Sequence, residues 1–313
     1  MQTYTTWTGL DDQHRGAAAA IGNFDGVHIG HQAVIDLARA VADRTGASLG
    51  ILTFEPHPRQ VFAPTSAPFR LMSAATKAHR LDKLGIDCLY QIEFNQDLSS
   101  LTPEEFARDV LSEGLGLSHV VVGDDFRFGK GRAGNTADLQ FFGEKLGFGV
   151  TIATLVSTDG GEVSSTNIRT ALSEGRPRDA AQMLGHWHRI DGEVLHGEKR
   201  GRALGFPTAN MSIADLRPPK FGVYAVKIDV LGGPHQGSYD GAASIGVRPM
   251  FGENQANLET YIFDFKGDLY GAQVSVALVD YLRPELKFEG LDALIAQMNL
   301  DCAQARQILA HTQ

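Results

Sequence analysis

Residues 21–31 read Ile-Gly-Asn-Phe-Asp-Gly-Val-His-Ile-Gly-His, and this stretch decides the fold of the chain. The apolar run 17–21 predicts a short buried strand, and residues 32–41 carry apolar side chains at helical spacing. A glycine-rich turn lies between them, so the sequence predicts a strand, a tight loop and a helix. Glycine lets a backbone approach a ligand closely, and a helix start offers unpaired N–H groups that suit a phosphate.

Two histidines of this string, His28 and His31, lie three residues apart across the junction of loop and helix. Both rings can direct a nitrogen at an anion bound there. A capping or packing role is the alternative, and half of a metal site is another. Zinc sites need further ligands at readable spacing, and Cys88 and Cys302 have no such companions. The whole string resembles the His-x-Gly-His signature of the nucleotidyltransferase superfamily, whose histidines bind triphosphate.

The composition is that of a globular protein with more than one domain. The 313 residues suggest two domains, and the formal net charge of −9 argues against a nucleic-acid partner. An anion site must therefore arise from local charge. Two distant cysteines form no disulfide framework, which favours a reducing cytoplasm. No apolar run approaches the roughly 20 residues that span a bilayer, and residues 1–10 lack a signal-peptide pattern, so no membrane partner is expected.

Apolar runs and helical patterns alternate through the first part of the chain. The runs that predict strands are 49–54, 88–94, 119–123 and 150–156. The patterns that predict helices are 73–84, 102–111, 137–146, 177–184 and a helix from residue 164 onward. Such alternation predicts an α/β domain with a parallel sheet, here over residues 1–185. Ligands of such sheets bind at the carboxyl ends of the strands, where the loops named below converge.

The pattern changes near Gly185, and residues 186–313 form the second predicted domain. Short strands with glycine turns are predicted at 190–195, 223–230, 238–245, 258–265 and 274–282. An amphipathic run over 291–309 predicts one closing helix. Together these features predict a small antiparallel β-barrel with a C-terminal helix.

A second anion-binding candidate in the first domain is Ser164-Ser-Thr-Asn-Ile-Arg169. Hydroxyls at a helix start cap its N–H groups, and an arginine about one turn later can form a fork onto phosphate oxygens. A plain N-cap with a surface arginine is the alternative. Beside the histidine loop, the functional interpretation is favoured, because nucleotidyl transfer needs donors for both the leaving pyrophosphate and the attacked phosphorus.

Aromatic side chains mark two other loops that follow predicted strands. Phe54 and Phe62 flank a Glu-Pro-His-Pro turn, and Phe126 and Phe128 flank an arginine. Each ring either stacks on a planar ligand or packs in the core beneath its loop. His57, held between two prolines, either reaches a nucleotide or serves as a turn residue.

Four strings together resemble the adenylyltransferase module of bacterial FAD synthetases. They are Gly22-Asn-Phe-Asp-Gly-Val-His-Ile-Gly-His31, Thr53-Phe-Glu-Pro-His-Pro58, Val122-Gly-Asp-Asp-Phe-Arg-Phe-Gly129 and Ser164-Ser-Thr-Asn-Ile-Arg169. The resemblance implies a Rossmann-like nucleotidyltransferase fold. It also implies that the FMN phosphate attacks the α-phosphorus of ATP directly, with Mg²⁺ on the phosphates.

The same resemblance implies the site residues of the first domain. The implied ATP-binding residues are Gly22, Phe24, Asp25, Gly26, His28, His31, His57, Ser164, Ser165, Thr166 and Arg169, of which His28, His31 and Arg169 act in catalysis. The implied flavin-binding residues are Phe54, Phe62, Asp125, Phe126 and Phe128.

In the second domain, residues 197–210 read Gly-Glu-Lys-Arg-Gly-Arg-Ala-Leu-Gly-Phe-Pro-Thr-Ala-Asn. Glycines with local cations can cradle an anion, although a solvated hairpin loop is the alternative. Thr208 and Asn210 lie two residues apart, so an extended segment places both on one face. Their hard oxygen atoms suit a Mg²⁺ ion that bridges a nucleotide.

This stretch, with later strings such as Glu259-Thr-Tyr-Ile-Phe-Asp-Phe265 and Leu282-Arg-Pro-Glu285, resembles the riboflavin kinase module. The resemblance implies Gly201, Gly205, Thr208 and Asn210 at ATP, with Thr208 and Asn210 also at the metal. It implies Glu259 as general base toward the ribityl hydroxyl, and Glu259 and Arg283 at the flavin. Met250 stands where the family commonly has threonine, and a modest effect on affinity is expected.

The resemblance covers residues 17–309 and predicts a bifunctional enzyme that phosphorylates riboflavin to FMN and adenylylates FMN to FAD. Its implied substrates are riboflavin, FMN and ATP, its implied cofactor is Mg²⁺, and a homo-oligomer stays open. The alternatives are another His-x-Gly-His nucleotidyltransferase, a class I aminoacyl-tRNA synthetase, and a flavin-binding carrier or sensor without catalysis. The chain lacks the lysine-rich loop of the synthetases, and the presence of both sets of catalytic residues argues against a carrier.

Overall fold

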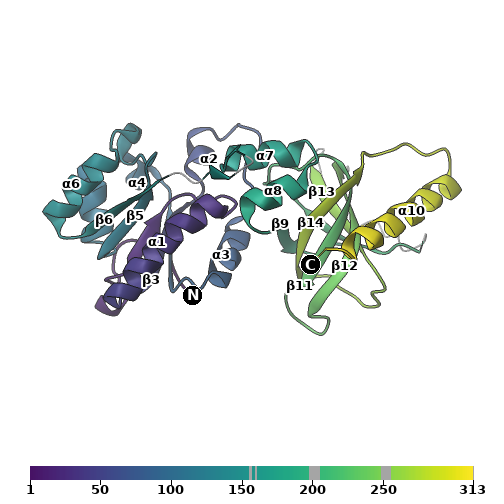
Figure 1. The fold of residues 1–313 in the computed structure, drawn as a ribbon, viewed down its shortest axis with the longest axis horizontal. Coiled ribbons are helices and arrows are strands. Elements are labelled where there is room, and N and C mark those ends of the chain that lie inside the picture. Colours follow the sequence, from purple (N-terminus) through teal and green to yellow (C-terminus); the bar gives the residue numbers. More distant parts are fainter. Residues whose placement is uncertain (155–156, 159–160, 197–204, 248–254, 313) are drawn as a thin grey trace. The chain divides into compact units, whose positions relative to one another are not determined.

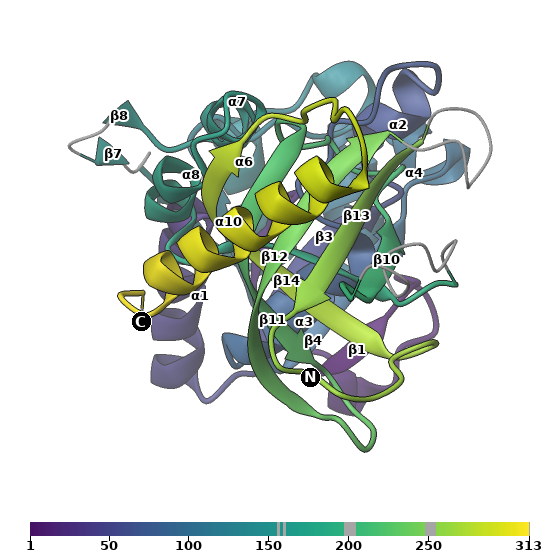
Figure 2. The same ribbon diagram turned by 90° about the vertical axis from the view of Figure 1, so that its right-hand side faces the viewer.

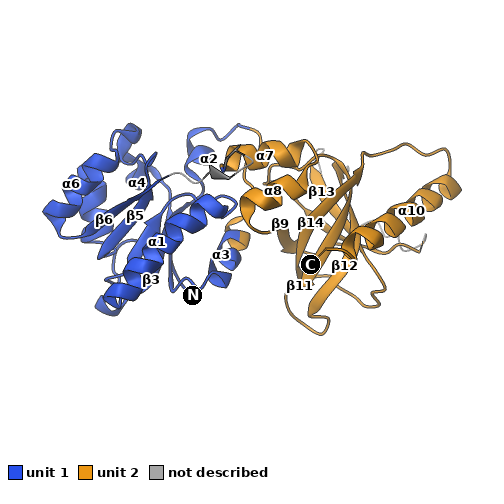
Figure 3. Cartoon of the chain, in the orientation of Figure 1, with its two compact units in different colours: residues 1–66, 77–163 blue, residues 67–76, 164–313 orange. Residues whose placement is uncertain are grey.

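A computed structural model describes residues 1–154, 157–158, 161–196, 205–247 and 255–312. The chain forms two compact units (Figure 3). Unit 1 consists of residues 1–66 and 77–163, and unit 2 consists of residues 67–76 and 164–313.

Unit 1 is built around a parallel sheet with the strand order β1–β4–β3–β2–β5–β6 (Figure 1). The strands are β1 (Gln2–Tyr4), β2 (Ala18–Ile21), β3 (Leu49–Glu55), β4 (Cys88–Glu93), β5 (His119–Gly123) and β6 (Gly149–Ala153). The predicted parallel sheet is confirmed, with β1 as an additional edge strand. Residues 155–156 of the last predicted strand lie outside the described residues.

Helices and short helical turns connect the strands of this sheet. They are η1 (Asp12–His14), α1 (Ile29–Thr45), α2 (Pro58–Phe62), α3 (Ala74–Lys83), α4 (Gln96–Ser100), α5 (Pro103–Glu105), the π-helix η2 (Phe106–Ser112), η3 (Lys130–Arg132) and α6 (Thr136–Leu146). The predicted capping box at Thr102 is present, because the Thr102 hydroxyl accepts from the Glu105 N–H at 3.2 Å and the Glu105 carboxylate accepts from the Thr102 N–H at 2.8 Å. All four residues of β2, Ala-Ala-Ala-Ile, are buried, so the central strand is covered on both sides.

The strand order reverses direction at β2. From β2 the chain moves to β3 and β4 on one side, and later to β5 and β6 on the other. Such a switch point opens a crevice at the carboxyl ends of the two strands, where open α/β sheets bind ligands. The loops that leave these ends begin at Gly22 after β2 and at Asp124 after β5. The histidine string therefore lies where the topology favours a ligand.

Unit 2 contains a curled antiparallel sheet with the order β10–β13–β12–β11–β14–β9. Its strands are β9 (His188–Glu193), β10 (Thr208–Ser212), β11 (Gly222–Val230), β12 (Gly237–Val247), β13 (Ala256–Ile262) and β14 (Gln273–Arg283). Leu195, just after β9, bridges Asn210 in β10, so the two edges of the sheet meet. Helix α10 (Leu291–Leu309) lies across the outside of β11, β12 and β14 (Figure 2). The predicted barrel with a C-terminal helix is confirmed.

Two further helices, α7 (Ser165–Ser173) and α8 (Pro177–Leu184), also belong to unit 2. Their apolar faces form a small core with Leu71. The Lys220 N–H donates to the Leu172 carbonyl at 2.9 Å, and Arg178 pairs with Asp280 of β14 at 2.9 Å. These contacts attach the helix pair to the barrel. A short hairpin of β7 (Ser157–Thr158) and β8 (Gly161–Glu162) precedes α7 in the chain.

Candidate active sites

The loop between β2 and α1 has an unusual backbone. Phe24 and Val27 have φ angles of 50° and 45°, and Gly26 between them has φ 93°. A positive φ is rare for non-glycine residues and is a clear outlier for a β-branched one such as valine. Residues held in such conformations cost about 1–3 kcal/mol each and concentrate at functional sites. Strain of this kind supports a binding role for the loop.

His28 is the N-cap of α1 and is 7% exposed. Its Nδ1 accepts a hydrogen bond from the His31 N–H at 3.2 Å. A neutral imidazole that accepts at Nδ1 carries its proton on Nε2, which leaves Nε2 as a donor. A Cβ on Gly30 would lie 3.1 Å from this ring, so glycine at that position gives the ring its room. The capping alternative is therefore present in the structure, and the contact of His28 with a phosphate stays a prediction.

His31 stacks on His28, with ring centroids 3.6 Å apart and an angle of 15° between the planes. Its Nδ1 is buried and has no hydrogen-bond partner among the described residues. Burial lowers the pKa of His31 well below its usual range, and the charges of His28 and Lys77 lower it further. Two imidazole rings this close repel each other when both are charged, so His28 and His31 favour the neutral form. A bound anion would favour protonation of one of the rings. The pair is thus suited to an anionic ligand.

The other predicted nucleotide residues of unit 1 lie on the same loop or at the end of β3. Gly22, Phe24, Asp25 and Gly26 belong to the loop, and Phe24 and Asp25 are 1% and 4% exposed. His57 is the N-cap of α2, and its Nδ1 accepts from the Arg59 N–H at 3.1 Å. The turn role considered for His57 is therefore present, and its contact with a nucleotide stays a prediction.

The predicted flavin residues of unit 1 differ widely in exposure. Phe54 and Phe128 are 9% and 5% exposed and belong to the hydrophobic core. Phe126 stacks on Phe128 with centroids 5.6 Å apart and is half-buried, and Asp125 is exposed. Phe62 is 69% exposed, and its ring meets the edge of Phe94. Phe62 is therefore the most accessible aromatic ring of this set, and the flavin contacts stay predictions.

The second predicted anion group lies in unit 2. Ser164 is the N-cap of α7, and its hydroxyl accepts from the Asn167 N–H at 3.2 Å. Ser165 and Thr166 follow in the first turn. Arg169 donates from Nε to the Phe69 carbonyl at 2.6 Å, and its guanidinium lies 5.6 Å from the Phe69 ring centroid. The 67–76 segment thus orients this arginine, whose phosphate contact stays a prediction.

In the barrel, Thr208, Asn210 and Glu259 lie on one outer surface of two paired strands. Asn210 in β10 is directly opposite Glu259 in β13, and Thr208 is opposite Tyr261. The Asn210 amide contacts the Thr208 hydroxyl at 3.4 Å. Directly opposed residues of an antiparallel pair point to the same side. The structure therefore brings these three predicted residues together.

A cavity and two further residues, Asn257 and Gly205, lie near this set in the barrel. A small cavity of about 70 Å³ lies beside Thr208 and is also lined by Phe265 and Tyr270. The buried Asn257 donates from Nδ2 to the Glu259 carboxylate at 3.3 Å. Gly205 has φ 84° and no atom within 4 Å of a Cβ position.

The remaining predicted residues of the barrel are Arg283, which lies on strand β14, and residues that the structure does not describe. Arg283 forms a two-pronged ion pair with Asp301 of α10, at 2.8 Å and 2.7 Å. That pairing gives it a role in holding the helix, and its contact with flavin stays a prediction. Gly201, Met250 and the rest of the 197–204 string lie outside the described residues.

Sequence reasoning missed two polar residues that touch these sites, Lys77 and Asn257. Lys77 is 1% exposed and contacts the loop after β2, although its helical pattern marks it as an ordinary surface lysine. The signal for Asn257 was its position two residues before Glu259 on one strand, which places both on one face.

Two sets of predicted phosphate-binding residues on two different folds are the pattern expected of a two-domain transferase that acts on nucleotides. A family model for FAD synthetase matches residues 10–167, and one for riboflavin kinase matches residues 184–309. The bifunctional riboflavin kinase/FMN adenylyltransferase of Pseudomonas fluorescens is 44% identical, with 96% of both chains covered. That of Listeria monocytogenes is 39% identical over 98% of this chain and 96% of the relative, and that of Escherichia coli K12 is 37% identical over 95% and 94%.

The chain belongs to the family of bifunctional riboflavin kinase/FMN adenylyltransferases. It carries an FAD synthetase domain followed by a riboflavin kinase domain, so the resemblance and the assignment as a transferase are confirmed. A solved structure titled macrolide-efflux protein from Streptococcus pneumoniae also matches, with a TM-score of 0.82 and 29% identity over 97% of this chain and 98% of that one. None of the described helices has the length and apolar character that crossing a membrane requires.

Proposed function

We propose that the two activities of the family are carried by the two residue sets described above. The functional boundary lies near residue 185, close to the start of the riboflavin kinase match at residue 184. Residues 1–185 adenylylate FMN, and residues 186–313 phosphorylate riboflavin. Two free cysteines, Cys88 and Cys302, support a reducing cytoplasm as the place of both reactions.

In the first reaction, a phosphate oxygen of FMN attacks the α-phosphorus of ATP and pyrophosphate leaves. No protein nucleophile is needed, so the protein contributes orientation and charge stabilisation. Nε2 of His28 donates to a triphosphate oxygen, and His31 takes up a proton or shares one with the anion. Arg169 and the hydroxyls at the start of α7 supply the second group of donors. Phe62 and Phe126 contact the flavin ring.

In the second reaction, Glu259 accepts the proton of the terminal ribityl hydroxyl of riboflavin. The resulting oxygen attacks the γ-phosphorus of ATP, and ADP leaves. A positioned carboxylate of this kind contributes roughly 10²–10⁴ in rate. The hydrogen bond from Asn257 at 3.3 Å orients the carboxylate for this step.

The donor set of the barrel fits Mg²⁺. A hydroxyl, an amide and a carboxylate lie on one surface at Thr208, Asn210 and Glu259, and hard oxygens are the ligands that Mg²⁺ prefers. The described residues hold no cluster of three or more acidic, histidine or cysteine side chains. Mg²⁺ is commonly bound by one or two protein side chains together with substrate phosphates. Thr208 and Asn210 would hold it, and it would neutralise charge on the phosphates.

The observation that carries this assignment is that the two residue sets belong to different folding units: the histidine pair is in unit 1, and the Thr208, Asn210 and Glu259 set is in unit 2. Substitutions should therefore affect one half-reaction each. We expect Glu259→Gln to lower FMN formation by roughly 10²–10⁴ and to leave FAD formation from supplied FMN unchanged. We expect His31→Ala to lower FAD formation roughly 10²–10³-fold and to spare FMN formation.

Separate assays with riboflavin and with FMN, each with Mg·ATP, measure the two half-reactions. Exposed Glu289→Gln and His311→Ala serve as matched controls and should change neither. If Glu259→Gln and His31→Ala depressed both reactions equally in a folded protein, the two-site assignment would be wrong. Absence of any product with the wild-type protein would favour a flavin carrier.

A further inference from the structure

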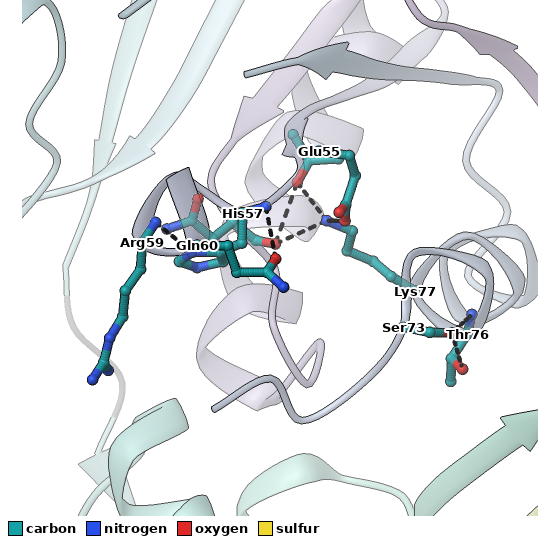
Figure 4. A network of polar contacts seen from close by, with 9 residues as sticks. Glu55, His57, Arg59, Gln60, Ser73, Thr76 and Lys77 are labelled. Carbon is teal, nitrogen blue, oxygen red and sulfur yellow. Dashed lines mark hydrogen bonds and ion pairs between the residues drawn. The ribbon is translucent and has the colours of Figure 1, made fainter. Parts of the chain in front are cut away.

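Lys77 in α3 is a buried cation at the carboxyl end of the unit 1 sheet. Its side chain reaches toward the Glu55 carboxylate at the end of β3 (Figure 4), and Nζ lies 2.8 Å from Oε1. Nζ also donates to the Thr53 hydroxyl at 2.9 Å and to the Asn23 carbonyl at 3.3 Å. Lys77 is 1% exposed. It therefore connects the end of strand β3 to the histidine loop that follows β2.

Glu55, Thr53 and Asn23 each place an acceptor within hydrogen-bond distance of the Lys77 ammonium. A lysine ammonium has three N–H donors and no acceptor. The group is thus directed at the protein itself, which makes a positioning role more suitable than direct contact with substrate.

The Asn23 carbonyl is the point where this network meets the strained loop. It accepts from Lys77 and also from the Thr53 hydroxyl at 3.2 Å, so two donors fix its direction. The next residue, Phe24, has φ 50°, and its ring packs 5.2 Å from the His31 ring. Lys77 is therefore connected to His31 through one carbonyl and one aromatic ring.

Folding alone does not require a charge here. Removing an ammonium and a carboxylate from water is costly, and well-packed apolar residues commonly replace a buried ion pair with little loss of stability. A polar network that joins the histidine loop to the neighbouring strand β3 fixes geometry instead, as supporting groups behind a reactive site do.

We propose that Lys77 is a positioning residue of the adenylyltransferase site: with Glu55 and Thr53 it fixes the Asn23 carbonyl and thereby the placement and charge state of His31. This inference rests on the proposed role of His31 in FAD formation. The titratable groups whose charge acts on His31 are His28, stacked on its ring, and Lys77 itself. Both lower its pKa, in addition to burial. Removal of the Lys77 charge should therefore raise the pKa of His31.

The test uses the full chain with both members of the ion pair replaced, Lys77→Met/Glu55→Gln, so that no buried charge is left alone. We expect kcat/KM for FAD formation from FMN to fall roughly 10- to 100-fold, because a small displacement of reacting groups costs about that much. FMN formation from riboflavin should stay within about twofold, which also reports that the protein is folded. Lys77→Arg, which keeps the charge, should recover part of the rate.

The pKa of His31, measured by NMR titration of its ring and assigned with His31→Gln, provides the second readout. It should rise in the double variant and stay low in Lys77→Arg. Lys83→Met, on the exposed end of the same helix, is the matched control and should change neither rate nor pKa. The proposal would be overturned if the folded double variant formed FAD at the wild-type rate, or if the pKa of His31 were the same in both proteins. A wild-type protein that formed no FAD would instead refute the proposed function, and the titration would still test Lys77.

Discussion

At the scale of single residues, His188 in β9 makes the stability of unit 2 depend on pH. Its side chain is 3% exposed, and burial lowers its pKa to about 3, with a smaller contribution from His186. An unfolded histidine titrates near 6.5. The unfolded chain therefore binds a proton that the folded chain excludes, so the free energy of unfolding falls as the pH drops below 6.5. Full stability is present only above that value.

We expect wild-type protein to lose about 2 kcal/mol through this residue between pH 7 and pH 5, and His188→Gln to lose correspondingly less. Urea unfolding at the two pH values, followed by the fluorescence of Trp187 in a Trp7→Phe background, measures the difference. The chain has two tryptophans, and Trp187 packs in unit 2. Equal losses in both proteins would show that His188 is not responsible.

The same scale shows what a sequence can and cannot reveal about a site. The placement of His28 and His31 together at a helix start was predictable, because the loop, the helix start and both rings lie within eleven consecutive residues. Lys77 was not, because its partners Thr53 and Asn23 are 24 and 54 residues away and a lysine within a helical pattern indicates an exposed surface. Phe128 packs in the hydrophobic core. Its sequence context could not show this, because an aromatic residue in a loop has the same pattern whether it packs in the core or faces a ligand.

At the scale of elements, a largely buried ion pair helps to hold helix α10 on the barrel. Arg283 at the end of β14 pairs with Asp301, and Gln297 also donates to Asp301 at 2.9 Å. The side chains of Arg283 and Asp301 are 17% and 7% exposed. We expect Asp301→Ala to lower the free energy of unfolding by roughly 3 kcal/mol, because it leaves the Arg283 charge unpaired in a buried position.

Urea unfolding reported by Trp187 measures this loss as well. Replacing both partners, Arg283→Met/Asp301→Leu, should recover most of the stability, since no charge then stays buried. Asp240→Ala is the matched control, because its pair with Lys227 at 3.6 Å is 45% exposed on the Asp240 side and should contribute less than about 1 kcal/mol. If the double variant were as unstable as Asp301→Ala, the loss of stability would not come from an unpaired charge on Arg283.

Elements with strong local signals were predicted well, and elements defined by distant partners were not. The amphipathic pattern gave both ends of α10, and the capping box gave the start of α5. β1 was missed because it has three residues and exists only through its pairing with β4. The seven residues of η2 continue the helix begun by α5 with wider π-helical turns, which no local pattern distinguished from an α-helix.

At the scale of the whole molecule, the two folding units are not two consecutive pieces of the sequence. Residues 67–76 lie between two parts of unit 1 in sequence but pack in unit 2. The Phe69 carbonyl accepts from Arg169, and the Arg70 carbonyl accepts from the Arg217 N–H at 2.8 Å. Partners separated by 100 residues or more leave no periodic signal. A division at one point in the sequence therefore cannot describe how the chain packs.

The proposed assignment of the two reactions to two different sites also predicts how the intermediate FMN moves. The formal net charge of −9 opposes retention of an anionic product at the protein surface, so FMN made by one molecule should reach another through solvent. We therefore expect a mixture of His31→Ala and Glu259→Gln proteins to convert riboflavin to FAD, although neither variant alone does so at an appreciable rate. FAD should appear after a lag during which FMN accumulates, and the lag should shorten as the His31→Ala concentration rises. Chromatographic separation of the flavins over time measures both species. A mixture that accumulates FMN but forms no FAD, while Glu259→Gln still adenylylates added FMN, would mean that FMN passes only between the two sites of one chain.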